Sequence, residues 1–179
     1  MQAFTIWFLL TTVFFIPNEN FKIDFSKDDN WYIVNDGVMG GLSKGNESIE
    51  NGRLGFSGNL SLENNGGFSW AKSNGLNWDL SDYEKVVIKY KTDDHGYDFT
   101  FETPEANNVA MFQKRLSPTG GKWKTEELSL DEFALTYFGQ DMGKTFAAEN
   151  RTEVLNIGIL IADKKPGNFE MQVDEIYFK

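Results

Sequence analysis

The sequence predicts an all-β fold, built as a two-sheet antiparallel jelly-roll sandwich with few short helices. Hydrophobic residues recur with a period of two through much of the chain, as in strands that bury one face. Turns rich in glycine and asparagine separate these runs, as they separate antiparallel strands. Eight or more such strands need a second packed sheet, because one sheet alone leaves an apolar face in water.

The individual strands follow from this alternation. It is clearest in residues 53–62, 97–102, 155–161 and 169–178, and Asn51-Gly52 is a strong two-residue hairpin signal before the first of them. Further strands are expected at Phe21–Phe25, Trp31–Asn35, Phe68–Lys72, Val86–Lys91 and Val109–Leu116. Turn residues lie between them at Asn64–Gly67, Asp93–Gly96, Pro118–Gly121 and Lys165–Gly167. Short helical pieces are expected around Leu130–Phe133 and Thr145–Glu149.

The chain begins with an apolar segment, Met1–Ile16, that carries no charged side chain. Its length suits the apolar region of a secretory signal better than a helix crossing the ~30 Å hydrocarbon core. We therefore expect residues 1–19 to be a signal peptide or N-terminal anchor and residues 20–179 to form the jelly-roll domain. The predicted location is extracytoplasmic, that is periplasmic or secreted, with or without a membrane anchor, and a cytoplasmic or mitochondrial location is the alternative.

Composition removes several classes of function. A net charge of −10 argues against a nucleic-acid partner, which needs a basic surface. Cysteine is absent, so disulfides and thiolate metal sites are excluded. His95 is the single histidine and lies in a polar turn, so we expect neither a catalytic triad nor a histidine metal site. No cofactor is predicted, and no two of the 27 acidic residues stand out as a glycosidase pair.

The most distinctive segment is Trp31–Ser43, which has the sequence W-Y-I-V-N-D-G-V-M-G-G-L-S. It starts as a strand and breaks into a loop whose glycines permit positive φ or a close backbone approach. A second unusual loop, Asn64–Phe68, has the sequence N-N-G-G-F. Together these loops resemble the complex I intermediate-associated protein 30 family, whose members carry W-x-x-V-N-D-x-V-M-G-G-x-S and then N-G-G-F. The resemblance extends from about Phe25 to Phe178.

This resemblance implies a galactose-binding-like jelly roll and a chaperone-like role in the assembly of respiratory complex I. The implied partner is a protein, such as a membrane-associated subunit of that complex. The N-terminus departs from a mitochondrial transit peptide, because it has no arginine and is apolar rather than amphipathic. The resemblance supplies no catalytic residue, so we expect a non-catalytic binding protein rather than an enzyme.

The motif residues have two interpretations. In the architectural one, they build the core and shape the loops, and Asp36 bonds backbone amides within its own loop. The residues assigned to this structural role are Trp31, Val34, Gly37, Gly40, Gly41, Gly66, Gly67 and Phe68. In the functional one, loops on a rigid scaffold form a recognition surface at one end of the sandwich. Its candidate binding residues are Asn35, Asp36, Met39, Asn65, Trp70 and Asp163.

The alternative function is a carbohydrate-binding jelly-roll module in an exported protein. Flat aromatic side chains would stack on sugar rings in such a module. The candidates for stacking are Trp70, Trp78 and Trp123.

Overall fold

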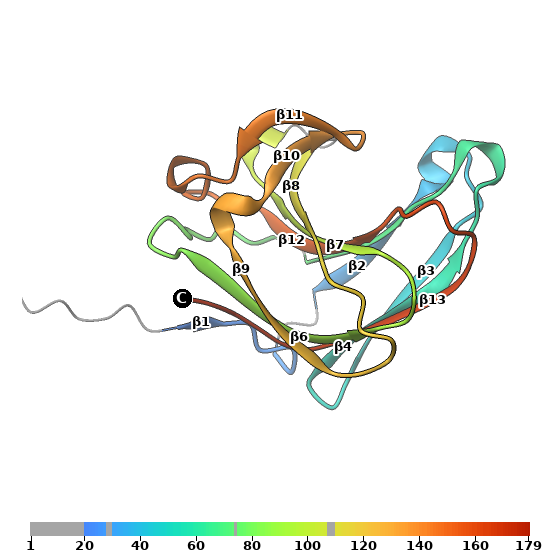
Figure 1. Cartoon of the computed structure of the whole chain (residues 1–179), viewed down its shortest axis with the longest axis horizontal. Coiled ribbons are helices and arrows are strands. Elements are labelled where there is room, and N and C mark those ends of the chain that lie inside the picture. Colours follow the sequence, from blue (N-terminus) through green and yellow to red (C-terminus); the bar gives the residue numbers. More distant parts are fainter. Residues whose placement is uncertain (1–19, 28–29, 74, 107–109) are drawn as a thin grey trace, which may run out of the picture.

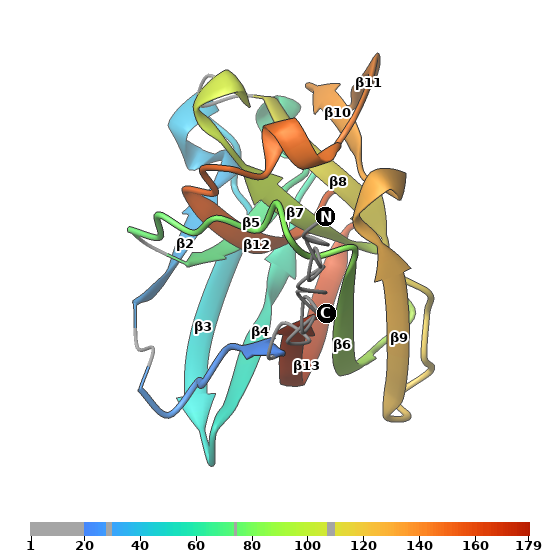
Figure 2. The same ribbon diagram turned by 90° about the vertical axis from the view of Figure 1, so that its left-hand side faces the viewer.

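The computed structural model describes residues 20–27, 30–73, 75–106 and 110–179, and this part forms a sandwich of two antiparallel sheets (Figure 1). The first sheet has the order β3 (Lys44–Glu50), β4 (Arg53–Leu60), β13 (Gly167–Phe178), β6 (Lys85–Thr92) and β9 (Lys124–Ser129), and β1 (Phe21–Lys22) also pairs with β13. The second has the order β11 (Gln140–Thr145), β10 (Ala134–Tyr137), β8 (Ala110–Arg115), β7 (Tyr97–Glu102), β12 (Asn156–Ile161), β5 (Ser69–Ser73) and β2 (Trp31–Asn35). Figure 2, turned by 90° about the vertical axis, shows the second sheet above the first. The all-β, two-sheet prediction is confirmed.

The core lies between the sheets and is rich in phenylalanine. Phe99 and Phe101 point inward from β7, with ring centroids 5.1 Å apart. Phe101 also stacks on Phe146, 4.6 Å away, and meets the edge of Phe133 at 5.0 Å. Such aromatic pairs add about 0.5–1.5 kcal/mol each to the free energy of burial. The high aromatic content of the chain is therefore used mainly in the interior.

The expected strands are present, with shifted ends. The run at 21–25 pairs as a strand only over β1, although Ile23 still donates its N–H to the carbonyl of Ile176, 3.0 Å away. The 169–178 run is one long strand, β13, with an irregularity between Val173 and Glu175 that accounts for its broken alternation. The signal or anchor predicted for residues 1–19 lies outside the described residues.

Three strands were missed by the sequence analysis, namely β9, β10 and β11. The helical piece predicted at Leu130–Phe133 is a 3-10 turn, η4 (Leu130–Glu132), and the β10–β11 hairpin that follows it was not predicted. The hairpin turns at Phe138 and Gly139, where φ is 47° and 75°. All residues of β11 are exposed, so no hydrophobic alternation marks it as a strand.

The remaining helical pieces are also 3-10 turns. The predicted piece at Thr145–Glu149 corresponds to η5 (Ala148–Asn150), whereas Thr145 ends β11. Three more turns follow strands: η1 (Asp36–Met39), η2 (Glu63–Asn65) and η3 (Pro104–Ala106). Figure 1 shows η1 and η2 side by side at one end of the sandwich. In the described residues no helix is long and apolar enough to cross a membrane.

Candidate functional site

The two motif loops meet around the side chain of Asp36. This residue follows β2 directly, and its side chain is buried although it starts a surface turn. Its main chain is held at both ends, since its N–H donates to the Phe68 carbonyl at 3.4 Å and its carbonyl accepts from the Gly41 N–H at 3.0 Å. The sharp turn of η1 therefore directs the carboxylate inward, between the loops.

The Asp36 carboxylate accepts four hydrogen bonds. Oδ1 accepts the N–H of Ser43 at 2.9 Å. Oδ2 accepts the Ser43 hydroxyl at 2.5 Å, the N–H of Gly67 at 2.6 Å and the N–H of Phe68 at 3.3 Å. The Ser43 oxygen in turn accepts the N–H of Ser61 at 3.0 Å. A buried carboxylate held in this way cross-links the loop after β2 to the loop after β4, and we call this arrangement the Asp36 cage.

One glycine of each motif is explained by the size of this cage. A Cβ atom on Gly41 would lie 2.3 Å from Cγ of Asp36, and one on Gly66 would lie 2.5 Å from Oδ2. Both distances are far below van der Waals contact, so only glycine lets the two backbones approach the carboxylate. Gly37 is different, because a Cβ there meets nothing within 4 Å. The structure therefore gives a steric reason for Gly41 and Gly66 and none for Gly37.

Asn35 makes a second cross-link beside the first. Its Oδ1 accepts the Ser69 hydroxyl at 2.7 Å and the N–H of Gly45 at 3.0 Å. It thus ties the end of β2 to β5 and to β3, which belongs to the other sheet. The Asn35-Asp36 pair fixes where both loops leave the sandwich.

The cage also controls the ionisation of Asp36. Burial raises the pKa of the Asp36 carboxyl, but the hydrogen bonds from Ser43, Gly67 and Phe68 outweigh burial and hold the pKa below its ordinary value of 3.8. The carboxylate is thus ionised at neutral pH, and its oxygens are already engaged by donors of the protein. Such a group suits a structural role better than that of a general base.

Apolar side chains project from the outside of the same loops. Val38 is 78% exposed, Met39 59%, Leu42 50% and Leu62 42%, and we call these four residues the apical patch. They make up half of the large hydrophobic side chains that are exposed in the described part of the chain. Isolated exposed apolar residues are common, whereas several on neighbouring loops are less so, which makes this patch a candidate interaction surface.

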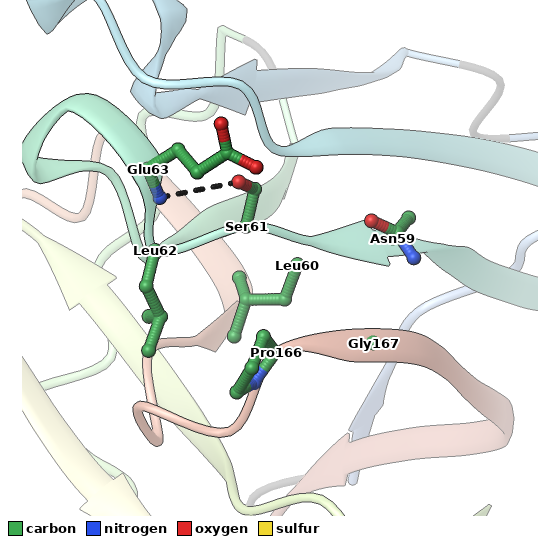
Figure 3. A pocket seen from close by; sticks show the side chains of 7 residues that line it. All are labelled: Asn59, Leu60, Ser61, Leu62, Glu63, Pro166 and Gly167. Atoms are coloured by element: carbon green, nitrogen blue, oxygen red, sulfur yellow. Dashed lines mark hydrogen bonds between the residues drawn. The ribbon is translucent and has the colours of Figure 1, made fainter.

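Two adjoining hollows lie beside the apical patch. One has a volume of about 570 Å³ (Figure 3). It is lined by residues 59–63, at and just beyond the end of β4, and by Pro166 and Gly167 at the start of β13. The other, of about 480 Å³, is lined by residues 41–44 and shares Asn59, Ser61 and Glu63 with the first. Figure 3 shows Leu62 and Pro166 from two different segments facing one space. The hollows extend the surface that the loops present.

The structure brings part of the predicted binding set together and separates the rest. Asn35 and Asp36 lie in the cross-links, while Met39 and Asn65 are exposed on the two loops above them. Among the structural residues, Trp31 packs in the core as expected, but Val34 does not. Val34 is half-buried and outside the core, because alternation along β2 turns Trp31 inward and Val34 to the opposite face.

Trp70 lies away from the loops, on the outer face of the seven-stranded sheet. Its indole N–H donates to the hydroxyl of Thr100 at 3.0 Å. The ring lies over Gly158 of β12, where a Cβ atom on residue 158 would come within 2.5 Å of Nε1 of Trp70. The Lys72 ammonium, which is paired with Glu102, lies 4.3 Å from the ring centroid. Trp70 is only 6% exposed, so its ring offers no free face for stacking.

Asp163 cross-links a different pair of turns. It accepts the N–H of Gly96 at 2.9 Å and of Lys165 at 3.1 Å, and its Oδ2 lies 3.1 Å from Nδ1 of His95. Burial raises the pKa of Asp163, but the two backbone bonds and His95 outweigh burial and lower the pKa below its usual value. The 163–167 turn reaches the apical hollow through Pro166 rather than through Asp163.

Sequence reasoning missed residues that complete the site. Ser43 is the last residue of the first motif, and its hydroxyl links Asp36 to Ser61. Leu42 and Leu62 were not among the candidates, since an apolar residue is usually assigned to the core. Leu42 carried an available signal, since it stands between a glycine and a serine outside any alternating run, whereas Leu62 ends the alternating run 53–62 and carried none.

Comparison of the fold with solved structures gives carbohydrate-binding modules and parts of larger enzymes. The family 11 carbohydrate-binding module from Clostridium thermocellum, solved with a β-1,3-1,4-mixed-linked tetrasaccharide, has a TM-score of 0.62 at 18% identity and covers 89% of this chain and 94% of the module. An agarase has a TM-score of 0.58 at 11% identity, over 88% of this chain and 24% of the enzyme. At these identities the likeness shows the jelly-roll fold alone.

Comparison of the sequence gives the family. A protein of Neurospora crassa named "Complex I intermediate-associated protein 30, mitochondrial" is 27% identical over 101 residues, which is 56% of this chain and 36% of that protein. The chain thus matches about a third of the length of this relative. The model of the family described as Complex I intermediate-associated protein 30 matches residues 20–173, which include both motif loops. The chain therefore belongs to the complex I intermediate-associated protein 30 family.

Proposed function

We propose that this chain is a non-catalytic binding protein that docks on a protein partner through the apical patch, in the manner of a chaperone-like assembly factor. The observation that carries the proposal is the exposure of Val38, Met39, Leu42 and Leu62 on loops that the Asp36 cage holds in place. Water-exposed apolar side chains gain free energy when a partner covers them, at about 25 cal/mol per Å² of buried apolar surface. Loops fixed beforehand lose little further entropy on binding.

Within this proposal the candidate residues have two roles. Met39 and Asn65, with the rest of the apical patch, contact the partner, because they are exposed on the loops. Asn35 and Asp36 position those loops through their cross-links. Trp70 and Asp163 lie outside this surface and stabilise other parts of the sandwich.

The partner that the family suggests is a subunit or assembly intermediate of respiratory complex I. The Neurospora relative carries this association and a mitochondrial location in its name, which supports the organellar alternative for this chain. An extracytoplasmic location would depend on residues 1–19 acting as a signal or anchor. Fractionation of the native host separates these two proposals.

Affinity capture with matched methionine variants tests the proposal. The tagged protein is captured from gently solubilised native membranes, and co-purified proteins are quantified by mass spectrometry. We expect enrichment of complex I subunits with the parent protein and about a tenfold loss with Met39→Glu, because a charge in the patch must be desolvated on docking. Met142→Glu is the matched control, since Met142 is similarly exposed, at 53%, on β11.

Two results would count against docking through this patch. Equal enrichment with Met39→Glu and Met142→Glu would move the interface elsewhere on the molecule. Recovery of no complex I subunit with the parent protein would remove the assembly role. Circular dichroism of both variants checks that each is folded.

Carbohydrate binding is a second candidate, favoured by the exposure of Trp123. Among the described tryptophans, Trp123 is 40% exposed, whereas Trp31 and Trp70 are each 6% exposed and Trp78 is half-buried. An exposed indole offers a flat apolar face on which a pyranose ring can stack. Titration with a panel of neutral and charged oligosaccharides tests this candidate independently of the capture experiment.

A further inference from the structure

Trp123 stands on the outer face of the six-stranded sheet, far along the chain from either motif loop. It immediately precedes β9, whose first residue Lys124 pairs with Tyr90 of β6. This register brings Trp123 level with Lys91, the next residue of β6. Tyr90 is buried in the core, so the alternation of β6 directs Lys89 and Lys91 to the outer face with Trp123.

Three cationic groups gather around the Trp123 ring. Cζ of Arg53 lies 5.3 Å from the ring centroid, Nζ of Lys91 5.4 Å and Nζ of Lys89 5.8 Å. They come from two strands, β4 and β6, in a protein with 27 acidic and 17 basic residues. We call Trp123, Arg53, Lys89 and Lys91 the Trp123 cluster. Its local charge is opposite to that of the whole chain.

The cluster contains cationic donors that lack protein partners. Asp174 pairs with Nε of Arg53 and with Nζ of Lys89, each at 2.6 Å. In the described part of the chain, Lys91 has no ion pair, and the two terminal nitrogens of Arg53 have no hydrogen-bond partner. Asp174 thus pairs with two of the three cations, and the remaining donors of Arg53 and Lys91 can bind an added anion.

Polar groups continue the row across the sheet beside the ring. Lys91 pairs in register with Gln172 of β13, and Gln172 pairs with Gly55 of β4. The Gln172 amide is half-buried and donates to Glu170 at 3.1 Å, which leaves its oxygen to accept from a hydroxyl. Gly55 adds no side chain of its own, and the hydroxyl of Ser48 lies over it. The surface therefore offers an aromatic platform, anion donors and a hydroxyl acceptor in one line.

We infer that the Trp123 cluster is a binding site for an acidic sugar, that is, a uronate residue within a polysaccharide. The apolar face of the pyranose ring stacks on the indole, and the carboxylate pairs with Lys91 and Arg53. The sugar hydroxyls bond the Gln172 amide. A uronate supplies a flat apolar face, a carboxylate and several hydroxyls together, whereas an acidic peptide supplies the carboxylate without the hydroxyl-bearing ring. This inference deepens the second candidate function and rests on it.

Calorimetric titration with defined oligosaccharides tests the site. The probes are an oligogalacturonate, a neutral cello-oligosaccharide of the same length and a poly-glutamate peptide, each at low and at physiological salt. We expect the oligogalacturonate to bind most tightly and to lose about tenfold in affinity with Trp123→Ala and roughly threefold with Lys91→Ala. Raised salt should weaken binding, because the contact is charged and exposed. Tyr137→Ala and Lys44→Ala are the matched controls, an exposed tyrosine and an exposed lysine outside the cluster.

Each other outcome overturns the inference in a distinguishable way. Equal binding of the neutral oligosaccharide, lost with Trp123→Ala, would leave carbohydrate binding standing and remove the acidic specificity. Equal binding of poly-glutamate would assign the cluster to acidic peptides. No binding of any sugar would remove both the inference and the second candidate, and oligogalacturonate binding unchanged by Trp123→Ala would place the site elsewhere. The Met39→Glu variant should bind oligogalacturonate normally, so this test is independent of the apical patch.

Discussion

The Asp36 cage and the Trp123 cluster use charge in opposite ways. In the cage a single carboxylate is buried and accepts four hydrogen bonds from two loops. In the cluster the charged groups are exposed, and cations outnumber the carboxylate that pairs with them. A group whose bonds are all made within the protein maintains structure, while a group with unmade bonds is free to bind. On this basis Asp36 is architectural, and we propose that the exposed apolar side chains beside it and the distant Trp123 form the binding surfaces.

The strongest test of this comparison is a pair of glycine substitutions in the first motif. Gly41→Ala places a methyl group 2.3 Å from Cγ of Asp36, so the cage has to open. We expect a loss of about 3 kcal/mol in the free energy of unfolding, measured by urea titration. Gly37→Ala is the matched control four residues away, and it should change stability by less than about 0.5 kcal/mol, because the added methyl meets nothing.

Equal effects of the two alanine substitutions would contradict the steric explanation of the motif. The glycines would then serve chain flexibility or a partner contact rather than the approach to Asp36.

A smaller effect, dependent on pH, is expected for Asp36→Asn. The pKa of Asp36 is lowered in the folded protein, since its hydrogen bonds outweigh the effect of burial. Its ionisation therefore stabilises the fold fully above the unfolded value of 3.8, and this contribution is lost as the pH falls from there through the folded pKa. We expect Asp36→Asn to cost about 2 kcal/mol at pH 7. The gap between parent and variant, measured by urea titration, should narrow at pH 3, and a gap that stays constant would show that the charge is immaterial.

The fold could be predicted from the sequence because its core strands alternate. Tyr97, Phe99 and Phe101 mark β7 by the same pattern that buries them between the sheets. β11 could not be found in this way, since it is paired on one side only and exposes every side chain. Its position is fixed by the turn at Phe138 and Gly139 and by pairing with β10, which are tertiary effects that a hydrophobic pattern does not contain.

The site was predicted in part for a related reason. The sequence indicated that the loops at 36–43 and 64–68 belong together, and the structure joins them through Asp36. It could not indicate that Asp36 is buried, because carboxylates are usually exposed, or that Trp70 is covered by Lys72. Of the apical patch only Met39 was predicted, because the exposure of Val38, Leu42 and Leu62 is a property of the folded loops rather than of the residue type.

Amide hydrogen exchange measured residue by residue tests most directly whether Asp36 holds the two loops together. The informative amides are those of Ser43 and Gly67, which donate to the carboxylate although they lie in loops. Our account predicts that both are protected in the parent protein and exchange much faster in Asp36→Asn, while the amides of β12 stay protected in both. Rapid exchange of Ser43 and Gly67 in the parent, or protection that survives the substitution, would contradict it.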